Sequence, residues 1–237
     1  MMVKKQEKNA IVLCSGGIDS VTTAFYVKNK LNYKSLTIMF FNYNQRNIKP
    51  EIFFSKQCAK SLKANFVGIN VSNLSKFSLS LLNSKKMHKR LSRSNLSNTK
   101  EESKDWYVPA RNLVFLSYAL AFSDFLFLNK KIKSDIFVGF KNEGSENFPD
   151  TSKTFVKQMN NISKETTESK PKIIAPLIEK DKEDIIELAT KLKVDLKNTF
   201  SCYTSSDLRH CGTCLACMLR KEGFHWSNIE DPAIYKE

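Results

Sequence analysis

The sequence lacks, near its start, any stretch that would serve as an export signal or a membrane anchor. The apolar run at residues 10–14 is short and leads directly into glycines. A signal peptide needs a longer apolar segment, and a bilayer span needs about 20 apolar residues. We therefore expect this run to be a buried strand, and the protein to be cytoplasmic with no membrane contact.

The chain also has few acidic residues for its number of basic ones: 24 Asp and Glu stand against 38 Lys and Arg, a net charge of +14. Clustered basic side chains can neutralise the phosphates of a nucleic acid. However, Lys, Asn and Ser are abundant along the whole chain, and no run alternates basic residues with aromatic side chains on which bases could stack. The charge therefore does not favour nucleic-acid binding as the primary function.

No internal repeat is visible, and 237 residues that are 41% hydrophobic suit one packed domain of ordinary size. Short apolar runs predict buried strands at residues 10–14, 35–41, 65–71 and 135–140. Helical patterns lie at residues 20–31, 49–62, 110–128 and 180–192. This alternation predicts an α/β fold with a doubly wound parallel sheet.

Residues 72–105 interrupt the alternation. They are basic, rich in Ser and Asn, and show no periodicity. A structureless stretch of this length inside a domain is typically functional or disordered. We expect a long mobile loop here, which would act as a lid if it is functional.

The first predicted strand is followed by a Ser-Gly-Gly-x-Asp-Ser motif, made of Ser15, Gly16, Gly17, Ile18, Asp19 and Ser20. Adjacent glycines let backbone amides turn toward an anion, and a helix start adds its dipole. A plain strand-to-helix turn is the alternative interpretation. The motif resembles that of the PP-loop ATP pyrophosphatases, which cleave ATP between the α and β phosphates and form an adenylate. The resemblance implies that these six residues bind ATP, with Mg²⁺ bridging Asp19 to the phosphates.

Four cysteines are spaced C-x8-C-x2-C-x2-C: Cys202, Cys211, Cys214 and Cys217. Without an export signal they should stay reduced, and clustered thiols in a reducing compartment are more often metal ligands than disulfides. Four thiolates converging on one centre make a closed tetrahedral site, which predicts structural Zn²⁺. An iron–sulfur cluster is the main alternative, and a redox or unliganded set is another.

The motif and the cysteines, together with Val-Pro-Ala-Arg-Asn at residues 108–112, resemble the 7-cyano-7-deazaguanine synthase family over nearly the whole chain. Residues 41–46, 148–150 and 201–203 are also similar to that family's pattern. The resemblance implies a carbon–nitrogen ligase of queuosine or archaeosine biosynthesis. Such an enzyme adenylates 7-carboxy-7-deazaguanine with ATP, admits ammonia to form the amide, and dehydrates the amide to the nitrile.

The same resemblance assigns roles to particular residues. Asp19 and Arg111 are the catalytic candidates, and the substrate-binding candidates are Arg111, Asn112, Glu143, Phe148 and Asp150. The planar fork of an arginine suits a carboxylate or a phosphate, although Arg111 could also be a surface residue at a helix start. Carboxylates accept hydrogen bonds from a guanine-like edge, although solvated loop carboxylates are the alternative for Asp150 and Glu143. The sequence departs from the bacterial form of the pattern at Lys141, Phe148, Thr151 and Ser152.

By this interpretation residues 1–200 form the ATP-binding and catalytic domain, and residues 201–237 form a zinc-binding region packed on it. Two other hypotheses stay open. A family relative could join the activated carboxylate to another amine, such as one on a partner protein. A zinc-stabilised tRNA-modifying or RNA-binding protein could use the basic residues at 85–93. A homodimer is compatible with the sequence.

Overall fold

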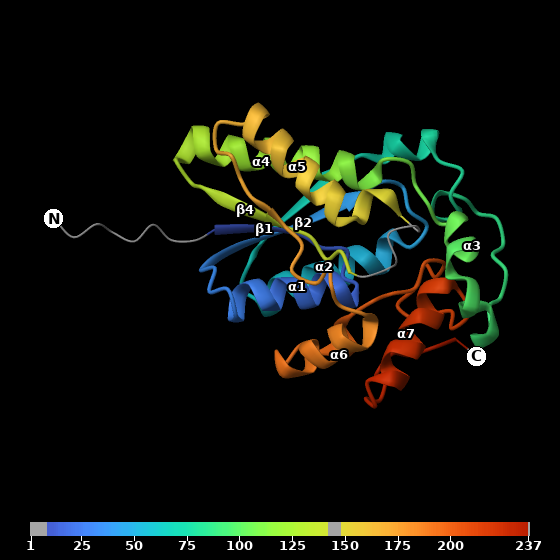
Figure 1. The fold of residues 1–237 in the computed structure, drawn as a ribbon. Helices are drawn as coiled ribbons and strands as arrows, with labels where there is room; N and C mark the ends of the chain where they lie inside the picture. Colours follow the sequence, from blue (N-terminus) through green and yellow to red (C-terminus); the bar gives the residue numbers. More distant parts are fainter. Residues whose placement is uncertain (1–8, 142–147, 237) are drawn as a thin grey trace.

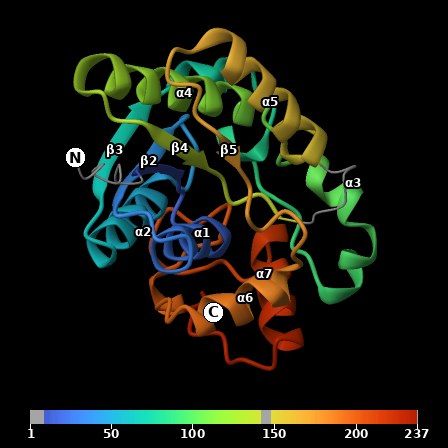
Figure 2. The same ribbon diagram turned by 60° about the vertical axis from the view of Figure 1, so that its left-hand side comes forward.

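The structure is a computed structural model and describes residues 9–141 and 148–236. Five parallel strands form one sheet in the order β3-β2-β1-β4-β5 (Figures 1 and 2). The strands are β1 (Asn9–Leu13), β2 (Ser35–Asn42), β3 (Asn65–Asn70), β4 (Ser134–Phe137) and β5 (Ile173–Ile174). The helices are α1 (Ile18–Asn29), α2 (Ile48–Ser61), α3 (Thr99–Lys104), α4 (Arg111–Lys130), α5 (Lys153–Thr166), α6 (Lys182–Lys191) and α7 (Leu215–Trp226). The predicted doubly wound sheet is confirmed.

Successive strand residues point to opposite sides of the sheet, so these apolar strands present apolar side chains on both faces. Helices cover both faces and bury these side chains. In β1, Ile11 joins the core beneath α4 and α5, whereas Ala10 and Val12 join the core beneath α1, α2 and α6. Figure 2 shows α4 and α5 on one side of the sheet and α1, α2 and α6 on the other. β1 has β2 on one side and β4 on the other, so the strand order reverses beside it. A crevice at the carboxyl ends of the strands is the usual ligand site of such a sheet.

Helix α4 is long and apolar enough, by length and composition, to cross a membrane. It packs instead along the sheet, in contact with β4 and β1. Leu116 and Ala119 on its inner side are completely buried, while Tyr118 and Phe125 on its outer side are exposed. These contacts are those of a core helix that covers one face of a sheet.

The expectation of a stretch without regular structure at residues 72–105 is wrong. The segment forms the short 3₁₀ helices Ser72–Phe77, Leu81–Asn83 and Arg93–Asn98, followed by α3. Leu82 and Leu91 are buried, and the backbone N–H of Leu91 donates to the carbonyl of Thr213 at 2.9 Å. Helices of one or two turns are too short to give a periodic pattern, so the order of this segment depends on contacts distant in sequence.

Helices α5 and α7 were not among the predicted helices. Ser152 caps α5 by accepting a hydrogen bond from the N–H of Phe155 at 3.1 Å. α7 begins directly after Cys214, so two of the predicted metal ligands lie at its start. The cysteine spacing predicts the metal ligands but carries no signal for the helix that contains Cys217.

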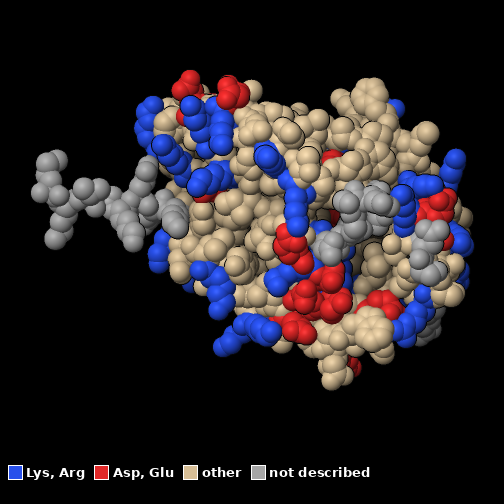
Figure 3. Space-filling model, in the orientation of Figure 1, with Lys and Arg blue, Asp and Glu red and all other residues tan. Residues whose placement is uncertain are grey.

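Basic side chains do not gather into one stripe on the face shown in Figure 3. They are spread around that face, and acidic side chains gather near its centre. A nucleic acid is usually held by a continuous basic patch. This face therefore gives no support to the RNA-binding alternative.

Candidate active site

The loop between β1 and α1 turns sharply at the carboxyl end of the sheet. Gly16 has a φ of +83°, and a Cβ there would lie 2.8 Å from atoms of Phe54 and Ser55, so only glycine fits. Gly17 is the N-cap residue of α1 and has no side chain that could cap the helix. The first N–H groups of this helix therefore lack a capping side chain, which is the arrangement that binds anions.

Asp19, in the first turn of α1, forms an ion pair with Lys182 at the start of α6. The Lys182 Nζ lies 2.7 Å from each carboxylate oxygen of Asp19. The side chain of Lys182 is 17% exposed and that of Asp19 is 25% exposed. Lys182 also lines the cavity beside the loop. The sequence had not singled out this lysine, because it stands 163 positions from Asp19 and no local pattern joins the two.

Arg111, the first residue of α4, lies over Tyr43 at the carboxyl end of β2. Its Nη1 donates to the Tyr43 hydroxyl at 3.4 Å, and its guanidinium carbon is 5.5 Å from the ring centre. Burial raises the pKa of Tyr43, so its hydroxyl keeps its proton near neutral pH. Arg111 therefore stays a cation held against a neutral aromatic ring and can bind an anion from the cavity.

Asp150 and Asn112 bond to each other beneath the start of α4. The backbone N–H of Asn112 donates to Asp150 Oδ2 at 3.0 Å, and its side-chain amide donates to the Asp150 carbonyl at 3.2 Å. Both residues are only 8% exposed. One oxygen of Asp150 thus satisfies an N–H group at a helix start, in the way an acidic cap does.

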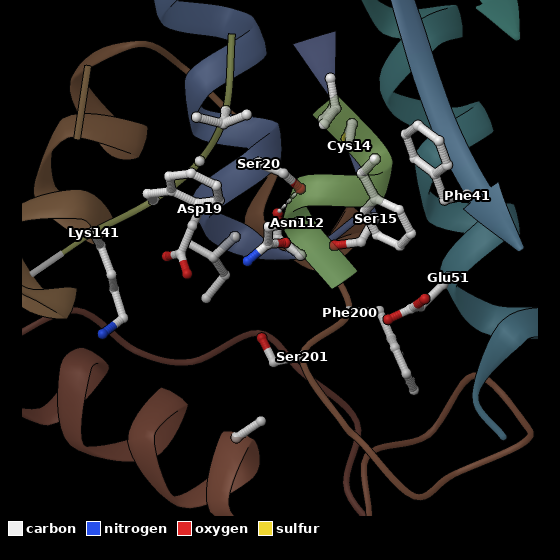
Figure 4. Close-up of a pocket in the computed structure, with 18 of the residues that line it drawn as sticks. Cys14, Ser15, Asp19, Ser20, Phe41, Glu51, Asn112, Lys141, Phe200 and Ser201 are labelled. Carbon is white, nitrogen blue, oxygen red and sulfur yellow. Dashed lines mark hydrogen bonds between the residues drawn. The ribbon is translucent and has the colours of Figure 1, made fainter. Parts of the chain in front are cut away.

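These elements enclose a cavity of about 270 Å³, whose walls Figure 4 shows. Its polar wall contains Ser15, Asp19, Ser20, Glu51, Arg111, Asn112, Lys141, Lys182 and Ser201. Its aromatic wall contains Phe40, Phe41, Tyr43, Phe115, Phe140, Phe200 and Tyr203. A smaller cavity of about 140 Å³ shares Arg111 and Lys141 with it and adds Trp106, Phe148 and Thr151. The combination suits a planar ligand that carries anionic groups.

Glu51 is the second carboxylate on the wall of the main cavity. It lies in the first turn of α2, and its oxygens accept from Gln45 Nε2 at 2.8 Å and from Asn47 Nδ2 at 3.1 Å. Burial raises the pKa of Glu51 to about 7, although the two amides and the charge of Arg111 oppose the shift. Glu51 was not among the predicted site residues.

The four predicted metal ligands converge after β5. The ligand atoms of Cys202, Cys211, Cys214 and Cys217 all lie within 4.8 Å of one another. Backbone N–H groups point at the sulfurs: those of Thr204, Ser205 and Cys211 donate to Cys202 Sγ, and those of Thr213 and Cys214 donate to Cys211 Sγ, at 3.3–3.4 Å. Such donors stabilise thiolates, so the group can bind a metal ion.

The comparisons with known proteins agree with this geometry. The family model described as queuosine biosynthesis protein QueC matches residues 9–228. The chain belongs to the QueC family. The 7-cyano-7-deazaguanine synthase of Methanocaldococcus jannaschii is 35% identical over 237 residues, which cover 96% of this chain and 99% of that protein. The protein of the same name from Rickettsia felis is 35% identical over 235 residues, again 96% and 99% of the two chains.

A solved structure also aligns with this QueC-family chain. The U34-tRNA thiolase NcsA from Methanococcus maripaludis has 14% sequence identity and a TM-score of 0.46. The alignment covers 95% of this chain and 67% of the thiolase. The family assignment depends on the sequence relatives, which confirm the resemblance predicted from the phosphate loop, residues 108–112 and the cysteine cluster.

The structure brings most of the predicted site residues of this family member together. Ser15, Gly17, Ile18, Asp19, Ser20, Arg111 and Asn112 line the main cavity. Phe148 lines the smaller cavity, whereas Asp150 lies beneath α4 beside it. Glu143 lies outside the described residues. The binding roles of these residues remain predictions.

Proposed function

We propose that the protein is a 7-cyano-7-deazaguanine synthase, which uses ATP to convert 7-carboxy-7-deazaguanine and ammonia, through the amide, into the nitrile. One observation carries the proposal: an anion-binding helix start, a partly buried arginine and an aromatic wall meet in one cavity. The names of the QueC relatives favour this reaction over conjugation to an amine of a partner protein.

ATP is needed because a carboxylate is a poor electrophile and its oxygen is a poor leaving group. Adenylation makes AMP the leaving group, while the N-terminal N–H groups of α1 and the hydroxyls of Ser15 and Ser20 stabilise charge on the departing pyrophosphate. Asp19 is the residue that would hold Mg²⁺, which neutralises phosphate charge when bound. Lys182, which pairs with Asp19 at 2.7 Å, would then bind a phosphate oxygen instead.

Arg111 is the residue we assign to the substrate carboxylate. It lines both cavities and its planar fork is held by Tyr43. The deazaguanine ring would lie against the surrounding aromatic side chains, between α4 and Phe148. We assign the guanine-like edge to Asp150 Oδ1 and Glu143, since Asp150 Oδ2 already accepts from Asn112.

We propose that the four cysteines hold one structural Zn²⁺. Sulfurs that share one zinc ion with bonds of about 2.3 Å lie about 3.8 Å apart in a tetrahedron. The distances from Cys211 Sγ to Cys217 Sγ and from Cys214 Sγ to Cys202 Sγ are 3.9 and 4.0 Å. The cysteines of a four-iron cluster bind different irons and would lie farther apart. Residues 201–237 are proposed to form this zinc-binding region on the catalytic domain of residues 1–200.

The test combines the protein with ATP, Mg²⁺, ammonium and 7-carboxy-7-deazaguanine, and identifies the products by mass. We expect the nitrile together with AMP and pyrophosphate. ADP and phosphate as products would contradict the adenylate mechanism. An activated carboxylate that is consumed only when a partner protein is added would favour the conjugating relative. A tRNA-modifying or tRNA-binding protein would bind tRNA with steep salt dependence and release no pyrophosphate with the free base.

A further inference from the structure

Glu51 is a carboxylate that lines the main cavity but takes no part in the proposed phosphate site. It projects from the first turn of α2, which packs beside the phosphate loop: a Cβ on Gly16 would lie 3.1 Å from the Glu51 carbonyl oxygen. Figure 4 shows the Glu51 side chain across the cavity from Asp19, with Ser15 between them and Phe200 beside it. Glu51 therefore faces the cavity away from the Asp19–Lys182 ion pair.

Two amide side chains hold Glu51 in a fixed orientation. Gln45 Oε1 accepts from the N–H of Tyr43 at 2.9 Å, while its Nε2 donates both to the carbonyl of Phe41 at 3.0 Å and to Glu51. Asn47 Nδ2 donates both to the carbonyl of Cys202 at 2.8 Å and to Glu51. Because backbone groups orient both amides, each Glu51 oxygen accepts one N–H and keeps a second lone pair that can take up a proton.

Two ionisable groups that interact electrostatically with Glu51 are poor proton acceptors at neutral pH. Arg111 is a permanent cation, and burial keeps the Tyr43 hydroxyl protonated. Asp19 is the other carboxylate among the described residues that line the main cavity, and it is paired with Lys182. The pKa of Glu51, raised by burial to about 7, allows this group to gain and lose a proton under physiological conditions.

We propose that Glu51 is the catalytic base that accepts the proton from the attacking nitrogen, an inference that rests on the proposed synthase function. Ammonia attacks the carbonyl carbon of the acyl adenylate, a C–N bond forms, and the C–O bond to AMP breaks with its electron pair leaving on AMP. The nitrogen loses one proton, which passes to a Glu51 oxygen. The products are the amide, AMP and a neutral glutamic acid, which then releases its proton to solvent.

The test separates adenylation from nitrogen transfer in a Glu51→Gln variant. Pyrophosphate exchange into ATP, dependent on 7-carboxy-7-deazaguanine, should stay within a few-fold of the unaltered protein, because the phosphate site is intact. Amide formation with ammonium should fall by about 10²–10⁴-fold, the usual contribution of a general base. Hydroxylamine should react with the adenylate nearly as fast as in the unaltered protein, because its weakly basic nitrogen releases a proton to water without help.

Matched variants control for structural effects. Glu165→Gln, on the exposed side of α5, should leave every rate unchanged. Glu51→Asp keeps a carboxylate one methylene farther back and should slow only the ammonium reaction, by less than Glu51→Gln does. If Glu51→Gln does not fold, the contrast between the two nucleophiles in Glu51→Asp carries the same test.

Two results would overturn the inference. Normal amide formation by Glu51→Gln would show that the carboxylate is not needed, and equal slowing with ammonium and hydroxylamine would show that Glu51 only positions the pocket. Failure of the proposed function looks different, because the unaltered protein would then show no pyrophosphate exchange with the deazaguanine carboxylate.

Discussion

Replacement of Arg220 should reveal how much stability the C-terminal region draws from one buried charge. Arg220 lies in α7 and is 1% exposed. Its Nε and Nη2 donate to the carboxylate of Asp231 at 2.9–3.1 Å, its Nη1 donates to the Thr199 hydroxyl at 3.0 Å, and its Nη2 donates to the Leu196 carbonyl at 3.3 Å. The guanidinium therefore joins α7 to the chain on both sides of the cysteine cluster.

Arg220→Met keeps much of the side-chain volume but leaves Asp231 and the Leu196 carbonyl without these donors. Breaking a buried ion pair by removing one partner costs about 3–5 kcal/mol. In a domain of this size each kcal/mol lowers Tm by about 2–4 °C, so we expect a fall of roughly 6–20 °C in the metal-loaded protein. Thermal unfolding followed by circular dichroism measures it.

The control is Arg209→Met, because Arg209 pairs with Asp207 on the surface and its side chain is 59% exposed. An exposed pair contributes about 0–1 kcal/mol, so this variant should melt almost as the unaltered protein does. Arg220→Met combined with Asp231→Leu should recover part of the loss, since it removes the unpaired carboxylate. A Tm for Arg220→Met equal to that of Arg209→Met would refute the reasoning.

The same pair predicts a pH dependence. Burial opposes ionisation of Asp231, but the hydrogen bonds and charge of Arg220 outweigh it and hold the pKa of Asp231 below its ordinary value of 3.8. A carboxylate with a lowered folded-state pKa stabilises the protein above its ordinary pKa, and this contribution is lost as pH falls through the folded value. Arg220→Met should therefore lose less stability on acidification below pH 3.8 than the unaltered protein does.

The remaining predictions concern the metal and the cavity. Cys214→Ser should lower bound zinc, measured by elemental analysis, and solubility together, because a closed site loses one of its four ligands; full stability of the metal-free protein would contradict a structural role. Asp19→Ala should abolish pyrophosphate release, and Lys182→Ala should reduce it by about 10²–10³-fold, because each removes a charge from the phosphate site. Asp150→Asn should raise the KM for the deazaguanine by about ten-fold and leave ATP binding unchanged. Arg111→Lys should lower kcat in steady-state assays, because an ammonium group lacks the bidentate fork of a guanidinium.

The fold was predictable because its signals are local. Strands β1 and β2 are mostly apolar, as expected for strands buried on both faces, and the Ser-Gly-Gly-x-Asp-Ser motif marks the first strand-to-helix turn. The four cysteines were predictable because C-x2-C spacing already places thiols around one centre. In each case, neighbours along the chain determine the structure.

The missed features depend on pairs that only the folded chain brings together. Lys182 gains its role from Asp19, and Glu51 gains its environment from Arg111 and burial. In the sequence, Lys182 is one of many lysines, and Glu51 is one charge in an amphipathic helix. The order within residues 72–105 likewise depends on Leu91 reaching Thr213. No local pattern encodes these contacts.

A metal site with no open position can still affect the chemistry by fixing the residues around it. Cys202 stands between Ser201 and Tyr203, which both line the main cavity, and its carbonyl accepts from Asn47, which also holds Glu51. Two residues before Cys202, the N–H of Phe200 donates to the carbonyl of Gly16 in the phosphate loop at 2.8 Å. Metal binding contributes free energy to the folding of the residues around it. An ion bound by the four cysteines would therefore order residues 200–203, and through them both the phosphate loop and the Glu51 carboxylate.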